Sequence, residues 1–293
     1  MTRLHLVDGT FELFRAHFAP RPGQRDASGR DVKATVGLAS SLLQLLEDEE
    51  EAVSHIAVAF DNPVESFRND LFDGYKTGEG MPEELAAQFD AAERATAALG
   101  VTVWSMDRYE ADDALASGAA RFRDQVEQVR LMTPDKDLGQ SIRGTRVVQI
   151  DRMRQRLTNE KTLRELRGVG PASIPDWLGL MGDSADGIPG IPGFGAKSAA
   201  AVLAHYERIE AIPEDAADWE VAVRGAKRLA GNLAARRDEA LLYKRLATLV
   251  EDAPISRSLA ELEWRGVPRG AFEDFCAEMN ADRLRSRPRR WAD

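Results

Sequence analysis

The sequence predicts an α/β fold, in which a parallel, doubly wound sheet is followed by a mainly helical region. Three short apolar runs, 4–7, 56–60 and 129–132, have the length of buried strands. Helical patterns separate these runs, and strands that alternate with helices are typical of a parallel sheet. The chain has 293 residues, of which 43% are hydrophobic, so it can bury a sizeable core.

Apolar periodicity predicts the helices. Segment 33–46 is expected to form one helix, and segment 82–99, which opens with Pro82 and acidic residues, another. From about residue 181 onward, leucines recur and the chain is expected to be mainly helical. The side chains predicted to be buried in helices are Val36, Leu38, Leu42, Leu43, Leu46, Leu229, Leu233, Leu241, Leu242, Leu246 and Leu249.

Acidic residues come directly after each predicted strand. Asp8 follows the first strand and Asp61 the second, while Asp135 and Asp137 follow the third. In parallel doubly wound sheets, ligands bind outside the carboxyl ends of the strands. We therefore expect these carboxylates to converge on one crevice.

Two further acidic groups extend this pattern. Glu110, Asp112 and Asp113 begin a predicted helix, where acids are also common for ordinary helix stability. Asp183 and Asp186 lie three residues apart, so both carboxylates can face one way. Nine converging acids would repel one another unless cations bind. Oxygen ligands without His or Cys favour Mg²⁺, for which Mn²⁺ can substitute, and nine acids suit two ions better than one.

The segment 182–199, GDSADGIPGIPGFGAKSA, joins the last two acids to a second kind of chemistry. Its Gly/Pro run cannot form regular helix or strand. It ends in Gly195, Ala196, Lys197 and Ser198, followed by an apolar helical run at 199–203. Glycines that open a helix expose backbone N–H groups to which a phosphate can bind. A carboxylate pair beside a phosphate site indicates a nucleic-acid substrate.

These motifs together resemble the 5′ nuclease, or flap endonuclease, family, and most closely the 5′–3′ exonuclease domain of bacterial DNA polymerase I. The similarity covers nearly the whole chain. The matching pieces, in the family's order, are VDGT at 7, AFD at 59, FRNDLFDGYK at 67, EADD at 110, PDKD at 134 and LMGDSADGIPGIPGFGAKSA at 180.

The resemblance implies a PIN-like nuclease core at 1–180, with a short arch at about 74–98. It implies a helical DNA-binding region at 181–293, containing a helix–three-turn–helix element at about 181–205. The implied activity is divalent-metal-dependent 5′–3′ exonuclease and structure-specific flap endonuclease hydrolysis of DNA in replication or repair. The family's metal-binding acids match all nine residues identified above, Asp8, Asp61, Glu110, Asp112, Asp113, Asp135, Asp137, Asp183 and Asp186.

Other site residues follow from the same motifs. Lys76 matches a family lysine that helps to position the scissile phosphate, and Arg15, on the helix after Asp8, is a candidate phosphate contact. The candidate DNA-binding residues of the hairpin element are Gly193, Gly195, Lys197 and Ser198. By resemblance, a K⁺ ion that bridges to DNA would bind backbone carbonyls of Leu180, Met181, Pro189, Ile191 and Phe194.

The arch departs from the family pattern. Family members usually carry an arginine shortly after the lysine that Lys76 matches, yet no Lys or Arg occurs between Lys76 and Arg94 here. A threaded single strand would meet repulsion there, so we expect a preference for short flaps, nicks or recessed 5′ ends on double-stranded DNA. The acids of this stretch are Glu79, Glu83, Glu84, Asp90 and Glu93.

Composition limits the remaining possibilities. The net charge is −10, so DNA must be met by local basic patches, of which the tail at 283–291 is one candidate. Cys276 is alone, which excludes a disulfide within the chain, and no apolar run is long enough to span a membrane. We expect a free-standing, monomeric, cytoplasmic nuclease that works with a separate DNA polymerase. Two alternatives remain: a non-catalytic DNA-structure-binding protein of the same fold, and a PIN-type ribonuclease.

Overall fold

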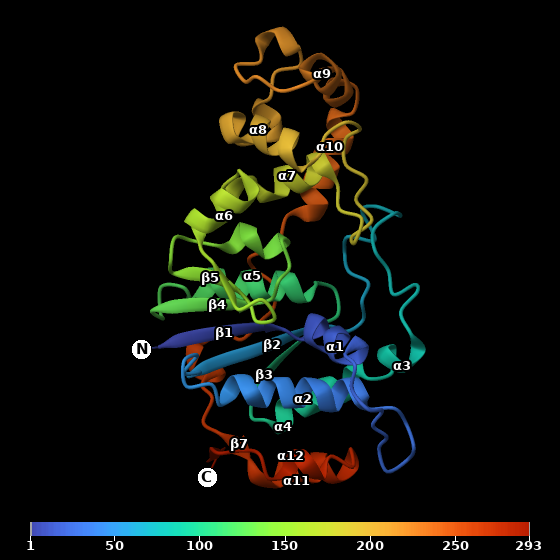
Figure 1. Cartoon of the computed structure of the whole chain (residues 1–293), viewed down its shortest axis with the longest axis vertical. Helices are drawn as coiled ribbons and strands as arrows, with labels where there is room; N and C mark the ends of the chain where they lie inside the picture. Colours follow the sequence, from blue (N-terminus) through green and yellow to red (C-terminus); the bar gives the residue numbers. More distant parts are fainter. Residues whose placement is uncertain (1, 293) are drawn as a thin grey trace. The chain divides into compact units, whose positions relative to one another are not determined.

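The computed structural model describes residues 2–292 and divides into two compact units. Unit 1 comprises Met1–Glu65, Gly78–Thr133 and Glu251–Asp293, and unit 2 comprises Ser66–Thr77 and Pro134–Val250. Both units are discontinuous in sequence, whereas the sequence analysis expects a single boundary at residue 180. The units are described separately below, and Figure 1 labels their helices and strands.

Unit 1 contains four parallel strands in the order β3-β2-β1-β4. The sequence analysis predicts β1, β2 and β4, and the parallel doubly wound arrangement is confirmed. Strand β3, which pairs with β2 at the sheet edge, was not predicted, because Thr102 and Ser105 leave it without an uninterrupted apolar run. The strands are β1 (Arg3–Asp8), β2 (His55–Asp61), β3 (Thr102–Met106) and β4 (Gln128–Met132).

Helices pack against these strands. Helices α1, α4 and α5 contact the sheet, and α2 lies against α1 and α4. Helix α2 has the predicted bounds, with Val36 half-buried and its other predicted core residues buried. The helices of unit 1 are α1 (Gly9–Phe18), α2 (Lys33–Leu46), α3 (Glu83–Ala86), α4 (Phe89–Ala98), α5 (Ala111–Phe122), α11 (Arg269–Glu278) and α12 (Asp282–Arg285).

The single helix expected at 82–99 is wrong, because the chain forms α3 and α4 with a break at Ala87 and Gln88. Gln88 is buried, and its side chain donates to the carbonyl of Glu84 at 2.7 Å and accepts from the backbone N–H of Thr35 at 3.0 Å. These bonds fasten the break to α2. Helix α4 is thereby part of the packed core of unit 1 rather than of a projecting arch.

The basic tail is folded onto unit 1. A short strand, β8 (Trp291–Ala292), pairs in parallel with β7 (Val267–Pro268). The Arg269 guanidinium lies 4.0 Å from the centroid of the Trp291 ring, which also packs edge-on against Phe272. The tail is therefore anchored to unit 1 through Trp291, while its arginines are exposed.

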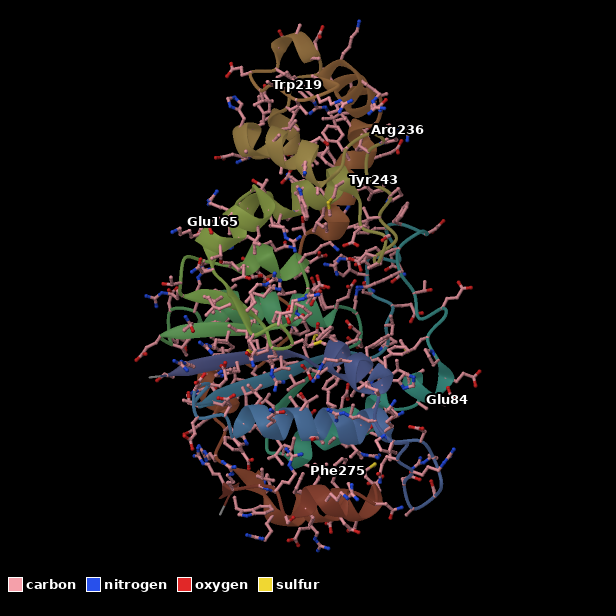
Figure 2. The ribbon with its side chains drawn as sticks, viewed as in Figure 1. Glu84, Glu165, Trp219, Arg236, Tyr243 and Phe275 are labelled. Carbon is pink, nitrogen blue, oxygen red and sulfur yellow. The ribbon has the colours of Figure 1, made fainter. Side chains whose placement is uncertain are left out.

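Unit 2 is mainly helical. Its core includes Leu229, Leu233 and Leu246, which are buried, while Leu241 and Leu242 pack against it partly exposed. Figure 2 shows Trp219 and Tyr243 among these helices. The elements are an antiparallel pair, β5 (Val147–Asp151) and β6 (Arg156–Thr158), with α6 (Glu160–Arg167), α7 (Ile174–Met181), α8 (Ala196–Tyr206), α9 (Ala226–Ala235) and α10 (Arg237–Ala247).

Candidate metal and phosphate sites

In unit 1, β1 ends at Asp8, which is also the N-cap of α1. Its Oδ1 accepts from the backbone N–H of Phe11 at 2.8 Å, and its Oδ2 accepts from the hydroxyl of Thr133 at 3.0 Å. Thr133 follows β4, so this bond joins the carboxyl ends of two neighbouring strands. Thr133 is not among the residues predicted from the sequence, although its place directly after a predicted strand was a usable signal.

The other acids of unit 1 gather at the start of α5. The backbone N–H of Ala111 donates to Oδ1 of Asp61 at 2.7 Å, and that of Glu110 donates to Oδ2 of Asp113 at 3.0 Å. Asp113 and Glu110 are buried, and together they form the capping box of α5, whereas Asp112 is half-buried. Asp61 is thus brought next to the EADD motif. Glu110 and Asp113 also cap the N-terminus of α5.

In unit 2, Asp137, Asp183 and Asp186 each place a carboxylate oxygen within 4.8 Å of the others. Burial, and then the like charges of Asp135 and Asp186, raise the pKa of Asp137 well above its usual value. Among residues 2–292, Oδ1 of Asp137 is buried and has no hydrogen-bond partner. Three clustered carboxylates, one with an unpartnered buried oxygen, fit a hard divalent cation.

Two lysines offset part of this negative charge. Lys136 forms an ion pair with Asp183; burial alone would lower the pKa of Lys136, but this bond and the charges of Asp137 and Asp135 raise it. Lys136 was missed by the sequence analysis, although its position inside PDKD pointed to it. Asp135 is exposed, and its Oδ1 accepts from the backbone N–H of Asp137 at 2.8 Å.

Lys76 is the second lysine. Its Nζ lies 2.9 Å from Oδ1 of Asp186, and its backbone N–H donates to the carbonyl of Asp186 at 3.0 Å. Gly187, which follows Asp186 in sequence, has a φ of +74°, and a Cβ there would lie 2.1 Å from the carbonyl oxygen of Gly74. The lysine-bearing segment and the acidic loop are therefore in direct backbone contact, which only glycine at 187 permits.

Arg15 is held inside unit 1. Its guanidinium forms an ion pair with the buried Glu12 and donates to Oγ of Ser41 at 2.7 Å. The Ser41 hydroxyl also donates to Glu12 at 2.8 Å. A phosphate contact by Arg15 stays a prediction, and it would have to compete with or share these bonds.

The predicted phosphate-binding turn opens α8. Gly195 is the N-cap, its N–H donates to Oγ of Ser198 at 3.0 Å, and Lys197 is exposed beside it. Gly195 has an extended φ of −136°, and a Cβ there would meet open space, so the backbone itself does not require glycine at this position. Gly193 differs, because its φ of +91° favours glycine.

Of the carbonyls expected to bind K⁺, those of Leu180 and Met181 lie at the C-terminal end of α7, and the others lie in the turns that precede α8. The carbonyl of Leu180 accepts from the N–H of Ile191 at 2.8 Å, and that of Ile191 accepts from the N–H of Phe194 at 3.0 Å. A carbonyl oxygen has a second lone pair, so these bonds are compatible with a cation. The carbonyls of Met181, Pro189 and Phe194 complete the set, and the K⁺ site stays a prediction.

No helix within residues 2–292 combines the length and apolarity needed to cross a bilayer. The sequence matches two family models. These are the 5′–3′ exonuclease N-terminal resolvase-like domain, over residues 3–167, and the 5′–3′ exonuclease C-terminal SAM fold, over residues 169–269.

Curated relatives include DNA polymerase I of Bacillus subtilis, with 35% identity over 292 residues, which cover 96% of this chain and 32% of that protein. DNA polymerase I of Mycobacterium tuberculosis is 33% identical over 291 residues, covering 96% of this chain and 31% of that protein. This chain thus spans about a third of the length of these relatives.

Solved structures share the fold. T5 5′-exonuclease with bound zinc has a TM-score of 0.66 and 16% identity, covering 94% of this chain and 99% of that one. The catalytic core of Rad2 in complex with DNA substrate has a TM-score of 0.61 and 12% identity, covering 96% and 88%. The two family models account for both the strand-rich and the helical regions. The chain belongs to the 5′–3′ exonuclease family.

Proposed function

We propose that this chain hydrolyses DNA phosphodiester bonds as a divalent-metal-dependent 5′–3′ exonuclease and flap endonuclease. The observation that carries the proposal is the cluster of Asp137, Asp183 and Asp186, with its buried and unpartnered carboxylate oxygen. Such a cluster is electrostatically unfavourable without a cation, and like-charge clusters of this kind are typical of functional sites.

We assign all nine acids as metal ligands, directly or through water. In unit 1 these are Asp8, Asp61, Glu110, Asp112 and Asp113, and in unit 2 Asp135, Asp137, Asp183 and Asp186. Two Mg²⁺ ions, when bound, would supply an activated water and stabilise the charge that develops on the leaving oxygen. The donor set is all oxygen, which fits Mg²⁺ and its substitute Mn²⁺.

Lys76 would position the scissile phosphate. In the absence of substrate its ammonium is paired with Asp186, and it is about a third exposed, so a phosphate can reach it. If Asp186 held a cation, the Lys76 ammonium would be available to a phosphate oxygen. Arg15 would assist if its guanidinium shares its hydrogen bonds with a phosphate.

The α8 N-terminus would bind a second phosphate of the duplex. Gly195 and Lys197 are exposed there, and the N–H groups at a helix start favour an anion. Ser198, Gly193 and the proposed K⁺ carbonyls would support the same contact. These contacts position the DNA and do not read its sequence.

The substrates that we propose are duplexes with a short 5′ flap, a nick or a recessed 5′ end, processed alongside a DNA polymerase in replication or repair. The support is the acidic stretch after Lys76. Glu83 and Glu84 on α3 are exposed, and Figure 2 shows Glu84 pointing away from the helix into solvent. Asp90 and Glu93 are less available, because both accept from the amide of Asn62, at 3.0 and 3.2 Å.

The test is a cleavage assay on a 5′-flapped DNA, on single-stranded RNA and on flapped DNA with EDTA. We expect Mg²⁺-dependent cleavage of the DNA alone. Asp183→Asn should lower the rate by roughly 10²-fold or more, because a buried negative ligand is lost, while duplex binding in EDTA persists. Asp218→Asn, an exposed acid of unit 2 outside the cluster, is the matched control. EDTA-resistant cleavage, or preferred cleavage of RNA, would refute the proposal.

A further inference from the structure

The segment that carries Lys76 contains no helix or strand. Residues 66–77 belong to unit 2 although the residues on either side of them in sequence belong to unit 1, and they form a series of turns. Such a segment has no regular backbone ladder to fix it, so its backbone is held by side chains and isolated hydrogen bonds. The position of the Lys76 ammonium therefore depends on those bonds.

Asn69 closes this segment into a loop. It is half-buried, and its side-chain amide donates to the backbone carbonyl of Lys76 at 2.9 Å, seven residues further along the chain. Its side-chain oxygen accepts from the backbone N–H of Ser66 at 2.8 Å, and its own N–H donates to the Ser66 carbonyl at 3.0 Å. The turn therefore orients the side chain of Asn69, and its amide fastens Lys76.

The turn that contains Asn69 is anchored in unit 2. The preceding residue, Arg68, is buried, and its guanidinium donates to the carbonyls of Leu246 at 2.8 Å and Thr248 at 3.1 Å. Leu246 lies in the last turn of α10, and Thr248 is the C-cap of that helix. Asn69 is thus fixed to the helical core, and it fixes the backbone of Lys76 in turn.

The bond from Asn69 differs from the bonds that join Lys76 to Asp186. The N–H and the ammonium of Lys76 both bond to Asp186, at 3.0 and 2.9 Å. Asp186 is also one of the three clustered acids, so its carboxylate is a group to which a cation would bind. The buried side chain of Tyr75 holds the residue before Lys76, whereas Asn69 holds the Lys76 carbonyl. Neither of these two contacts requires the Asp186 carboxylate.

We propose that Asn69 is a positioning residue, which fixes the backbone of Lys76 so that its ammonium meets the scissile phosphate. A lysine side chain is long and flexible, so its ammonium is well placed only if its backbone is fixed. Displacing a catalytic group by about 1 Å can lower a rate by roughly 10²-fold. The inference rests on the proposed function, because Asn69 has this task only if Lys76 binds a phosphate.

The test is a double-mutant cycle of Asn69→Ser and Lys76→Ala, measured as single-turnover cleavage of a 5′-flapped DNA at saturating enzyme and Mg²⁺. A serine at 69 can still accept from the N–H three residues earlier, as Ser198 does from Gly195 at 3.0 Å, but it is too short to reach Lys76. Asn69→Ser should lower the rate about tenfold when Lys76 is present. In the Lys76→Ala background it should lower the rate by less than about twofold, because the group that it positions is absent.

Two further measurements separate positioning from a general structural role. The Mg²⁺ concentration that gives half the maximal rate should be unchanged in Asn69→Ser, because the acids keep their places. Duplex affinity in EDTA should also be unchanged, because the α8 turn is intact. The matched control is Asn159→Ser, which replaces another half-buried asparagine of unit 2, the N-cap of α6, by a residue that caps equally well. It should cleave as the wild type does.

The outcomes distinguish this inference from the proposed function. A wild-type rate for Asn69→Ser beside a slow Lys76→Ala would overturn the inference and leave the proposed function standing. An equal fold loss in both backgrounds, or a raised Mg²⁺ requirement, would overturn it as well, because Asn69 would then act on the fold or on the acids. A wild-type rate for Lys76→Ala would remove the role of that lysine and the inference together. A chain that shows no Mg²⁺-dependent cleavage would refute the proposed function itself.

Discussion

The two acidic groups stabilise their negative charge in different ways. In unit 1, Asp8, Asp61 and Asp113 each accept a backbone N–H, and these donors lie in the first turn or at the cap of a helix. In unit 2, Asp137 and Asp186 face each other and Asp183, and Lys76 and Lys136 provide the opposite charge. Helix ends remain in place whatever binds, whereas lysines can move away. The unit 2 group is thus the one whose electrostatics must change when a cation or a phosphate arrives.

The largest effect should come from removing one of the lysines paired with the unit 2 acids. Lys76→Ala should lower the single-turnover cleavage rate by roughly 10²-fold or more, because the developing phosphate charge loses an electrostatic contact. Affinity for duplex should change little, since the α8 turn is intact. The matched control is Lys161→Ala, another lysine of unit 2, which lies on α6. A cleavage rate equal to that of the wild type would mean that the Lys76–Asp186 pair is only structural.

An intermediate effect should appear in stability without metal. The raised pKa of Asp137 means that the native state holds a proton to higher pH than the unfolded chain, whose carboxyl ionises near its ordinary pKa of 3.8. Stability contributed by this group therefore falls as pH rises from about 4 toward the native pKa. Asp137→Asn should remove that loss. In EDTA, the free energy of unfolding of this variant should therefore exceed that of the wild type by an amount that grows with pH.

Urea unfolding in EDTA at several pH values measures this difference. Added Mg²⁺ should cancel the gain, because the ion stabilises only the wild-type cluster. The control Asp218→Asn should show the pH dependence of the wild type. A constant difference between Asp137→Asn and the wild type across the pH range would show that burial and the neighbouring charges do not raise the pKa of Asp137.

The smallest effect should come from the helix-capping group. Asp8→Ala in EDTA should lower the free energy of unfolding by about 1 kcal/mol, as for the loss of an N-cap. Asp137→Asn is expected to raise the free energy of unfolding in EDTA, whereas Asp8→Ala is expected to lower it. The two variants therefore test directly the difference between the acidic groups of unit 2 and unit 1. Increased stability of Asp8→Ala in EDTA would show that repulsion outweighs capping in unit 1 as well.

Much of the fold could be predicted because local patterns determine it. The strand ending at Asp61 contains the uninterrupted apolar run 56–60, the strand ending at Asp8 is apolar over 4–7 except for His5, and α2 has a complete apolar face. The break between α3 and α4 could not be predicted, because it depends on Gln88 bonding to Thr35, a partner far away in sequence. The helix propensity of the residues in segment 82–99 does not indicate that bond.

The candidate site shows the same limit. Acids after strands could be found because topology alone brings strand ends to one edge. The pairing of Lys136 with Asp183 depends on a tertiary contact between two loops, which the sequence pattern leaves open.

The glycine at 187 has a consequence for anyone who exchanges parts between relatives. Because a methyl group at this position would strike the carbonyl oxygen of Gly74, the peptide that carries Lys76 and the loop that carries Asp186 behave as one interlocking component. A chimaera that imports a foreign arch should therefore inherit both pieces from the same parent. If the two segments came from different parents, the backbone contact between Gly74 and Gly187 would be disturbed and Lys76 would be displaced, even if every acidic residue were retained.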